Sequence, residues 1–246
     1  VLVGNPNCGK TALFNALTGS HQRVGNWSGV TVEKKSGAVD YKGKSCQLVD
    51  LPGIYSLFSG DVETALDEKI ACNFLVEEPI DVVVNVLDAT NLERHLYLTT
   101  QLLDLGIPVV VAVNMMDIAK LHQLDLDLHA LARGLQCPVV GVSAHRGDNV
   151  FALKHALFAQ LETPCYPREC VQLPAAVTRA KKTLVDLFRS EQRSNVQTAF
   201  CSMSALEGSW QSVSDYAPEH VDNARDRVAE LAPLLQEEVD LVVADR

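Results

Sequence analysis

The feature that most constrains the fold is a phosphate-binding loop close to the N-terminus. Residues 4–11 read Gly-Asn-Pro-Asn-Cys-Gly-Lys-Thr and match the pattern G-x-x-x-x-G-K-[ST]. The apolar residues Val1–Val3 precede the loop, and a helix-period pattern over 10–19 follows it. A strand before and a helix after distinguish this motif from a chance glycine-rich turn. The pattern therefore predicts a strand, a phosphate loop and a helix in direct succession.

The loop residues have distinct expected roles. The glycines let backbone N–H groups wrap a phosphate. Lys10 is expected to reach the outer phosphates, and the Thr11 hydroxyl is expected to ligate Mg²⁺. The predicted nucleotide contacts in this part of the chain are Gly4, Asn5, Pro6, Asn7, Cys8, Gly9, Lys10, Thr11 and Ala12.

Apolar runs that fit strands alternate with helix-period segments over the first two thirds of the sequence. Strands are expected at 2–3, 30–32, 46–49, 82–87, 109–113 and 139–142, and helices at 10–19, 62–77, 91–105, 125–135 and 147–161. This alternation predicts an α/β fold, with a mostly parallel sheet and helices on both faces. A proline-containing linker is expected at 163–174. Helical segments follow near 175–193, 196–206 and 219–246. We therefore predict an α/β domain over 1–163 and a small all-α domain over 164–246.

Composition narrows the classes of partner. The chain has 246 residues, 47% of them hydrophobic, and no apolar run approaches the roughly 18 to 20 residues of a membrane helix. A net charge of −10 argues against nucleic acid as a partner, because phosphate backbones need a basic surface. Seven scattered cysteines fit reduced thiols better than a disulfide framework. The seven histidines show no metal-ligand spacing, so we propose no iron site from them, and whether the chain contacts iron stays open.

A second motif, Asp50-Leu51-Pro52-Gly53, follows the apolar strand expected at 46–49. Asp50 is expected to hold Mg²⁺ through water, and the Gly53 N–H is expected to meet the γ-phosphate. The pattern D-x-x-G by itself is usually only a turn. Its position after a strand, behind a phosphate loop, is what favours the functional interpretation.

Guanine recognition is predicted at the ends of the last two strands. A carboxylate at Asp117 can accept two hydrogens from the N1 and N2 edge of guanine, which adenine cannot supply. Asn114 is expected to tie this base site to the phosphate loop, and a backbone N–H near Ser143 can reach the guanine O6. The pattern N-x-x-D is common as a plain turn, and Val142-Ser143-Ala144 is a weak signal by itself. Their positions after the expected strands, in this order along the chain, favour the functional interpretation. The predicted base contacts are Asn114, Met115, Met116, Asp117, Val142, Ser143 and Ala144.

Thr31 is the expected switch residue that completes the Mg²⁺ shell. It lies between the phosphate loop and Asp50, after a stretch rich in glycine and asparagine. Gly29 and Val30 are included in the predicted nucleotide site with it. Thr18 is the alternative, but it falls at the end of the first expected helix.

Trp27 lies in the same glycine-rich stretch and is expected to be exposed and functional. Its burial against a neighbouring domain is the structural alternative.

The catalytic glutamine of Ras-type GTPases is missing. The position after Gly53 holds Ile54, which cannot orient the attacking water. Hydrolysis is therefore expected to be slow or to use another device. Asn7 resembles the asparagine with which potassium-activated GTPases hold a monovalent cation beside the β- and γ-phosphates; bracing of the loop is its alternative role. The predicted catalytic residues are Asn7, Lys10, Thr31 and Gly53.

Several stretches together resemble the cytosolic N-terminal region of the FeoB family of bacterial ferrous iron transporters. They are residues 4–7, 23–33, 50–57 and 88–94, and the similarity is most specific over 1–160. The resemblance implies a GTPase fused to an inner-membrane domain that moves Fe²⁺, with this segment at the cytoplasmic face. It also implies that the helical part corresponds to that family's GDP-dissociation-inhibitor domain.

We therefore expect a Ras-like G domain that binds GTP with Mg²⁺, hydrolyses it with potassium as candidate activator, and regulates iron uptake. Expected partners are GTP and GDP, a membrane domain outside this chain and small accessory iron-transport proteins; the oligomeric state stays open. Two alternatives remain: a free-standing GTPase that acts on ribosomes or RNA, and a GTP-dependent switch with little catalysis. The net charge argues against the first.

Overall fold

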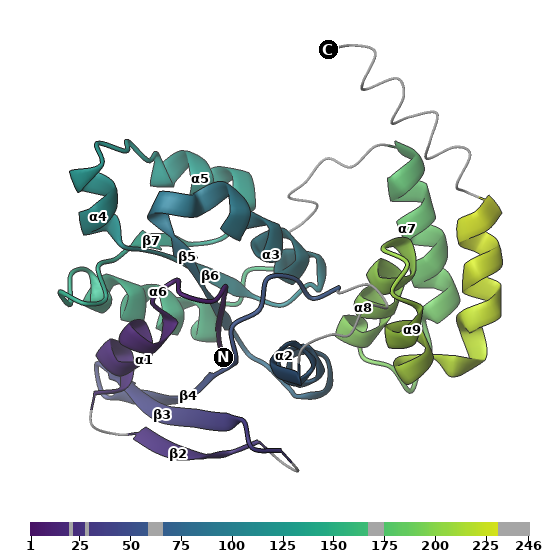
Figure 1. The fold of residues 1–246 in the computed structure, drawn as a ribbon, viewed down its shortest axis with the longest axis horizontal. Coiled ribbons are helices and arrows are strands. Elements are labelled where there is room, and N and C mark those ends of the chain that lie inside the picture. The colour runs from purple at the N-terminus through teal and green to yellow at the C-terminus, as the bar shows by residue number, and fades with distance from the viewer. Residues whose placement is uncertain (20–21, 28–29, 59–65, 167–174, 231–246) are drawn as a thin grey trace. The chain divides into compact units, whose positions relative to one another are not determined.

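The computed structural model describes residues 1–19, 22–27, 30–58, 66–166 and 175–230. These residues form two compact units. The first unit contains the described residues up to Leu57 and those of 66–166, and the second contains Phe58 and residues 175–230. Figure 1 shows a sheet with helices in the first and helices alone in the second. The boundary between residues 163 and 164, expected from the sequence, remains a proposal.

Among the described residues, the first unit holds a sheet of seven strands in the order β2-β3-β4-β1-β5-β6-β7. The β1–β4, β1–β5, β5–β6 and β6–β7 pairs are parallel, and the β2–β3 and β3–β4 pairs are antiparallel. The strands are β1 (Leu2–Gly4), β2 (Gln22–Asn26), β3 (Glu33–Tyr41), β4 (Lys44–Asp50), β5 (Val83–Asp88), β6 (Val109–Asn114) and β7 (Val139–Gly141). The predicted mostly parallel sheet is confirmed.

Helices cover both faces of this sheet (Figure 1). On one face, α1 (Lys10–Thr18) and α6 (Val150–Glu162) share a core with side chains of β1, β5 and β6. On the other face, Thr99 of α3 (Leu92–Asp104) donates a hydrogen bond to Asn85, whose side chain alternates with the core residues Val84 and Val86. The first unit also contains α2 (Leu66–Glu77), the short helix η1 (Ala89–Asn91), α4 (Met116–Leu121) and α5 (Leu128–Leu135).

The segment 30–32, predicted as a strand, is not one. The Trp27 N–H donates to the Val32 carbonyl at 2.9 Å, and the Val30 N–H donates to the Trp27 carbonyl at 3.3 Å. These backbone groups close a turn instead of joining a ladder. The strands on either side, β2 and β3, have polar sequences and no apolar run. They form because alternate residues of β3, including Val39 and Tyr41, reach the core.

Helix boundaries also differ in places from the prediction. The helix expected at 125–135 begins at Leu128, because Asp127 accepts a hydrogen bond from the Ala130 N–H and caps it. The separate helix α4 was not expected. For the helix expected at 62–77, the positions before Leu66 lie outside the described residues.

In the described part of the second unit all elements are helical, as predicted. They are α7 (Ala175–Phe188), α8 (Asn195–Leu206), α9 (Trp210–Tyr216), η2 (Pro218–His220) and a helical stretch at 221–230. Ser194 and Gln197 form a capping box that begins α8. A small core holds these helices together, formed by Leu184, Phe188, Cys201, Ala205, Val213, Ala217 and Ala224. The rest of the helix expected at 219–246 lies outside the described residues.

Candidate nucleotide-binding site

The phosphate loop connects β1 directly to α1. Its backbone is left-handed at Asn7 (φ 66°) and Gly9 (φ 82°), and asparagine and glycine are the residues that adopt this conformation most easily. A Cβ atom on Gly9 would collide with the Asn114 side-chain nitrogen. Glycine at this position therefore serves the turn and also leaves room for Asn114.

Asn114, at the end of β6, joins three of the sequence motifs. Its Nδ2 donates to the Cys8 carbonyl at 3.0 Å, and its Oδ1 accepts from the Ala144 N–H at 2.9 Å. The side chain is buried, so both hydrogen bonds are protected from water. The phosphate loop, the end of β6 and the loop after β7 are held together by this single amide.

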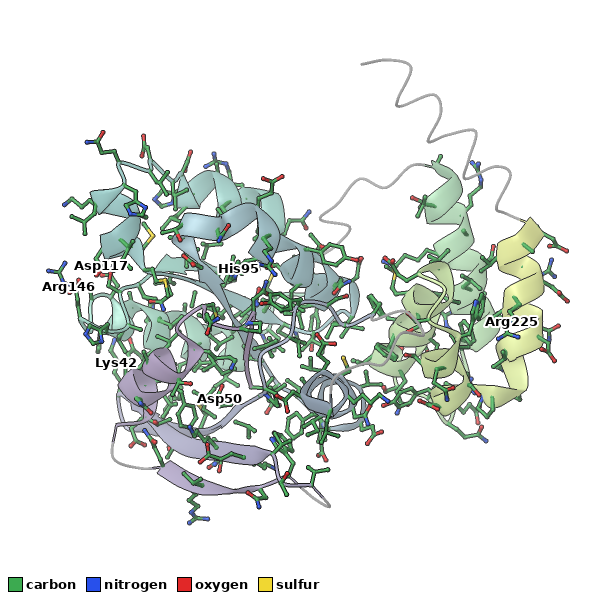
Figure 2. The ribbon with its side chains drawn as sticks, in the orientation of Figure 1. Lys42, Asp50, His95, Asp117, Arg146 and Arg225 are labelled. Atoms are coloured by element: carbon green, nitrogen blue, oxygen red, sulfur yellow. The ribbon has the colours of Figure 1, made fainter. Side chains whose placement is uncertain are left out.

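Asp117 lies in the first turn of α4, next to the loop that follows β7 (Figure 2). Its backbone N–H donates to Ser143 Oγ at 3.1 Å, and the Met116 N–H donates to the Val142 carbonyl at 3.2 Å. Met115 begins the helix with a left-handed backbone (φ 62°). These hydrogen bonds fix the turn between β6 and α4 to the residues that follow β7. Asp117 is half-exposed in this turn.

Lys10 and Asp50 lie together at the end of β4. Their side chains are largely buried, and Lys10 Nζ is 3.5 Å from Asp50 Oδ1 (Figure 2 labels Asp50). Burial raises the pKa of the Asp50 carboxyl, and the neighbouring Lys10 charge opposes this rise. Burial also raises the pKa of the Cys8 thiol to about 11, so this cysteine is protonated at neutral pH.

The same residues fit a magnesium ion. Mg²⁺ prefers oxygen ligands, and the buried Asp50 Oδ1 has only the ion pair with Lys10 and no hydrogen bond among the described residues. The Thr11 hydroxyl is in the exposed first turn of the adjacent α1. Within the described residues there is no cluster of three or more His, Cys, Asp or Glu side chains that could hold a metal ion by themselves. One carboxylate and one hydroxyl offer oxygen ligands, and Mg²⁺ commonly takes its other ligands from substrate phosphates and water.

Gly53 lies directly against the phosphate loop. A Cβ at this position would be 3.1 Å from both Cα and N of Pro6, which is tighter than side chains normally approach. The next residue, Ile54, is fully buried and donates its N–H to the Gly4 carbonyl at 3.2 Å. The side chain at the position of the Ras glutamine is therefore in the core.

Thr31 is not brought to the Lys10–Asp50 pair in this structure. It is exposed in the turn between β2 and β3, and the described contacts of Lys10 and Asp50 include no hydrogen bond to it. Val30 is half-buried in the same turn, and Gly29 lies outside the described residues. The alternative, Thr18, is buried and donates to the Phe14 carbonyl at 2.8 Å, as a helix-end residue does.

The expectation that Trp27 is exposed is wrong. Its side chain is buried, and its ring meets Phe74 of α2 edge-on, with centroids 5.3 Å apart. Lys34 Nζ lies 4.6 Å from the Trp27 ring centroid. The aromatic pair and the cation–π contact make the large Trp27 ring more stable buried than exposed to water. The turn that carries Thr31 is therefore packed against α2.

The remaining predicted contacts are on or beside these loops. Asn5 is buried, and neither of its side-chain polar atoms has a partner among the described residues. Asn7 is exposed at the tip of the loop. The others are half-buried or buried: Pro6, Ala12, Leu51, Pro52, Met115, Met116, Val142, Ser143 and Ala144.

Two residues of α3 that touch the segment after Gly53 were missed from the sequence. Arg94 stacks on Tyr55, and Gln101 bonds to Ser56 and Leu57. Residues seven apart share one face of a helix, and this spacing is the signal that could have suggested a common role.

Comparisons with known proteins agree with this architecture. The family model described as ferrous iron transport protein B matches residues 1–157. The Fe(2+) transporter FeoB of Salmonella typhimurium is 54% identical over 156 residues, which is 63% of this chain and 20% of that protein. The chain thus spans a fifth of the length of the curated relatives it matches. None of the helices in the described ranges is long and apolar enough to cross a membrane.

Two solved structures cover nearly the whole chain. The cytosolic domain of L. pneumophila FeoB has 39% identity and a TM-score of 0.79, over 95% of this chain and 97% of that one. A mutant of S. thermophilus NFeoB bound to GDP has 32% identity and a TM-score of 0.82, over 99% of this chain and 93% of that one.

Proposed function

The chain belongs to the N-terminal family of ferrous iron transport protein B, and we propose that it binds GTP and hydrolyses it to GDP and phosphate. The observation that supports this most directly is the Asn114 amide, which joins the phosphate loop to the two base-recognition motifs. Such a link fixes the distance between a phosphate site and a guanine site. The GDP bound by the S. thermophilus relative supports the same ligand class.

Each part of the nucleotide has residues suited to it. Backbone N–H groups of the phosphate loop, Pro6 excepted, and the Lys10 ammonium suit the phosphates, and Asp117 suits the guanine edge. Thr11, Asp50 and Thr31 would hold Mg²⁺, which neutralises charge on the phosphate oxygens when bound. Thr31 lies in a turn that Trp27 packs against α2, so its participation requires that turn to rearrange.

Hydrolysis forms a bond from a water oxygen to the γ-phosphorus and breaks the bond to the oxygen that bridges the β- and γ-phosphates. The proton of the water ends on the released phosphate. Lys10 faces the developing charge, and the Gly53 N–H can donate to a γ-phosphate oxygen. Ile54 is buried and takes no part, so a slow intrinsic rate is expected.

We propose that potassium bound with the help of Asn7 stimulates the reaction. Asn7 is exposed on the loop beside the expected phosphate position, so its oxygen is available to a cation. Hydrolysis in potassium chloride should exceed that in matched sodium chloride by about tenfold, below the 10³ to 10⁵ of arginine fingers. Steady-state phosphate release measures this.

The structure refines the choice of variant for this test. Asn7 has a left-handed backbone, so Asn7→Ala adds strain, whereas Asn7→Gly removes the amide without it. Asn7→Gly should lose the preference for potassium. Equal wild-type rates in the two salts would refute potassium activation, and a preference that survives Asn7→Gly would place the ion elsewhere.

The burial of Ile54 favours one other function, a GTP-dependent switch with negligible catalysis. Single-turnover hydrolysis of pre-bound GTP in potassium chloride distinguishes the two. Conversion of the bound GTP to GDP supports the enzyme, and recovery of intact GTP supports the switch.

We also propose that the chain controls Fe²⁺ movement as the nucleotide-binding part of a transporter at the cytoplasmic face of a bacterial inner membrane. The 54% identity to the Salmonella transporter supports this. In cells that lack other ferrous uptake, the full-length protein with Lys10→Ala should take up much less radioactive Fe²⁺ than the wild type at equal protein level. Equal uptake would contradict a role for the nucleotide site in transport.

A further inference from the structure

The segment 51–57 is held at its start by β1. The Leu51 N–H donates to the Leu2 carbonyl at 3.1 Å, and the Ile54 N–H donates to the Gly4 carbonyl at 3.2 Å. Between them, Gly53 contacts Pro6 of the phosphate loop. Hydrogen bonds to β1 therefore hold this end of the segment beside the sheet.

The other end is held by Gln101 of α3. Its Oε1 accepts from the Leu57 N–H at 2.8 Å, and its Nε2 donates to Ser56 Oγ at 3.0 Å. Gln101 is only 4% exposed, so its amide depends on these partners for its hydrogen bonds. Cys72 of α2 adds a contact from its Sγ to the Leu57 carbonyl at 3.4 Å.

Arg94, two turns before Gln101 on the same helix, reaches the middle of the segment. Its guanidinium carbon is 4.4 Å from the centroid of the Tyr55 ring, within the range of a cation–π contact. Both side chains are exposed, so this contact is the weaker of the two. The α3 helix therefore touches three consecutive residues, Tyr55, Ser56 and Leu57.

We propose that Gln101 is a positioning residue for GTP hydrolysis, assisted by Arg94. By fixing Ser56 and Leu57, it prevents the segment from moving away from the phosphate loop and so keeps the Gly53 N–H where the γ-phosphate is expected. The proposal rests on the proposed function. GDP has no γ-phosphate, so loss of the Gln101 contacts slows hydrolysis and leaves GDP binding unchanged.

The test compares Gln101→Leu with the wild type in single-turnover hydrolysis and in GDP titration. Gln101→Leu should slow hydrolysis by about tenfold or more, since a misplacement of about 1 Å can cost as much as 10²-fold. Its affinity for GDP should stay within about twofold of the wild type. Gln101→Glu, which keeps an acceptor for the Leu57 N–H, should recover part of the rate.

The matched control is Thr99→Val. It removes a buried hydrogen bond from the same helix, 2.7 Å from Thr99 Oγ1 to Asn85 Oδ1, without touching the segment. Thr99→Val should lower the melting temperature and leave the rate of hydrolysis unchanged. If Gln101→Leu and Thr99→Val slow hydrolysis equally, or if Gln101→Leu loses GDP affinity in parallel with rate, the residue is structural and the proposal is wrong.

Arg94→Gln keeps the proposal testable if Gln101→Leu does not fold, because Arg94 is on the surface. Arg94→Gln should slow hydrolysis by a smaller factor than Gln101→Leu and leave the affinity for GDP unchanged. A rate of hydrolysis equal to that of the wild type would count against the proposal. A wild-type chain that binds GTP without hydrolysing it would instead overturn the proposed function itself. The two failures are therefore distinguishable.

Discussion

Replacing Asp117 with asparagine is expected to weaken GTP binding by about 2 to 4 kcal/mol, the cost of losing a charge-assisted pair of hydrogen bonds in a protected site. The carboxylate accepts from guanine N1 and N2, whereas an asparagine presents one donor and one acceptor. Xanthine carries an oxygen at C2, which accepts a hydrogen bond. The same substitution should therefore shift the preference toward a xanthine nucleotide.

Titration with labelled guanine and xanthine nucleotides measures both effects. Asp125→Asn is the matched control, since it makes the same chemical change at an exposed position just after α4. It should leave the affinity for GTP unchanged. A loss smaller than about tenfold for Asp117→Asn, which is 1.4 kcal/mol, would mean that the base site has been assigned to the wrong residue.

Lys10→Ala and Thr11→Ala are each expected to abolish turnover while the fold remains intact. Lys10 supplies the positive charge that faces the outer phosphates, and Thr11 supplies an oxygen for Mg²⁺. In the structure Lys10 also pairs with Asp50, so Lys10→Ala leaves a largely buried carboxyl without its cation. The pKa of Asp50 should then rise further, because the neighbouring positive charge that opposes the effect of burial is gone.

Phosphate release under multiple-turnover conditions measures the loss, and circular dichroism checks the fold. Lys44→Ala is a suitable control, because Lys44 is exposed and forms a surface ion pair with Glu162. Such pairs contribute only about 0 to 1 kcal/mol. Its turnover should match the wild type. An unchanged turnover rate in folded Thr11→Ala protein would overturn the Mg²⁺ assignment.

The motifs could be placed from the sequence because each one follows an apolar strand. In a parallel sheet the carboxyl ends of the strands meet at one edge, so motifs far apart in sequence converge. The link from Asn114 to Cys8 is an example, since the two residues are 106 positions apart in the sequence. The order of the motifs along the chain, each after an apolar strand, was enough to predict that they lie near one another.

Features that depend on tertiary partners could not be read in this way. Val30–Val32 has the composition of a strand, but its backbone is used in a turn that places Trp27 against Phe74. Neither the turn nor the distant aromatic partner is encoded locally. The same holds for Gln101, an ordinary polar residue on a helix until the structure shows which backbone N–H it accepts from.

The assignment of Phe58 to the helical unit has a practical consequence for dissecting the protein. Leu57 ends the part of the segment held by α3, and the next side chain belongs to the other unit, where its ring lies 5.5 Å from that of Phe200. Phe58 is 6% exposed. Cutting the chain after residue 163 would leave this ring on the α/β piece without its cover, at a cost of about 1.5 to 3 kcal/mol in lost burial. The two units are therefore interleaved in sequence, and a cut after residue 163 separates Phe58 from the helical unit that contains Phe200.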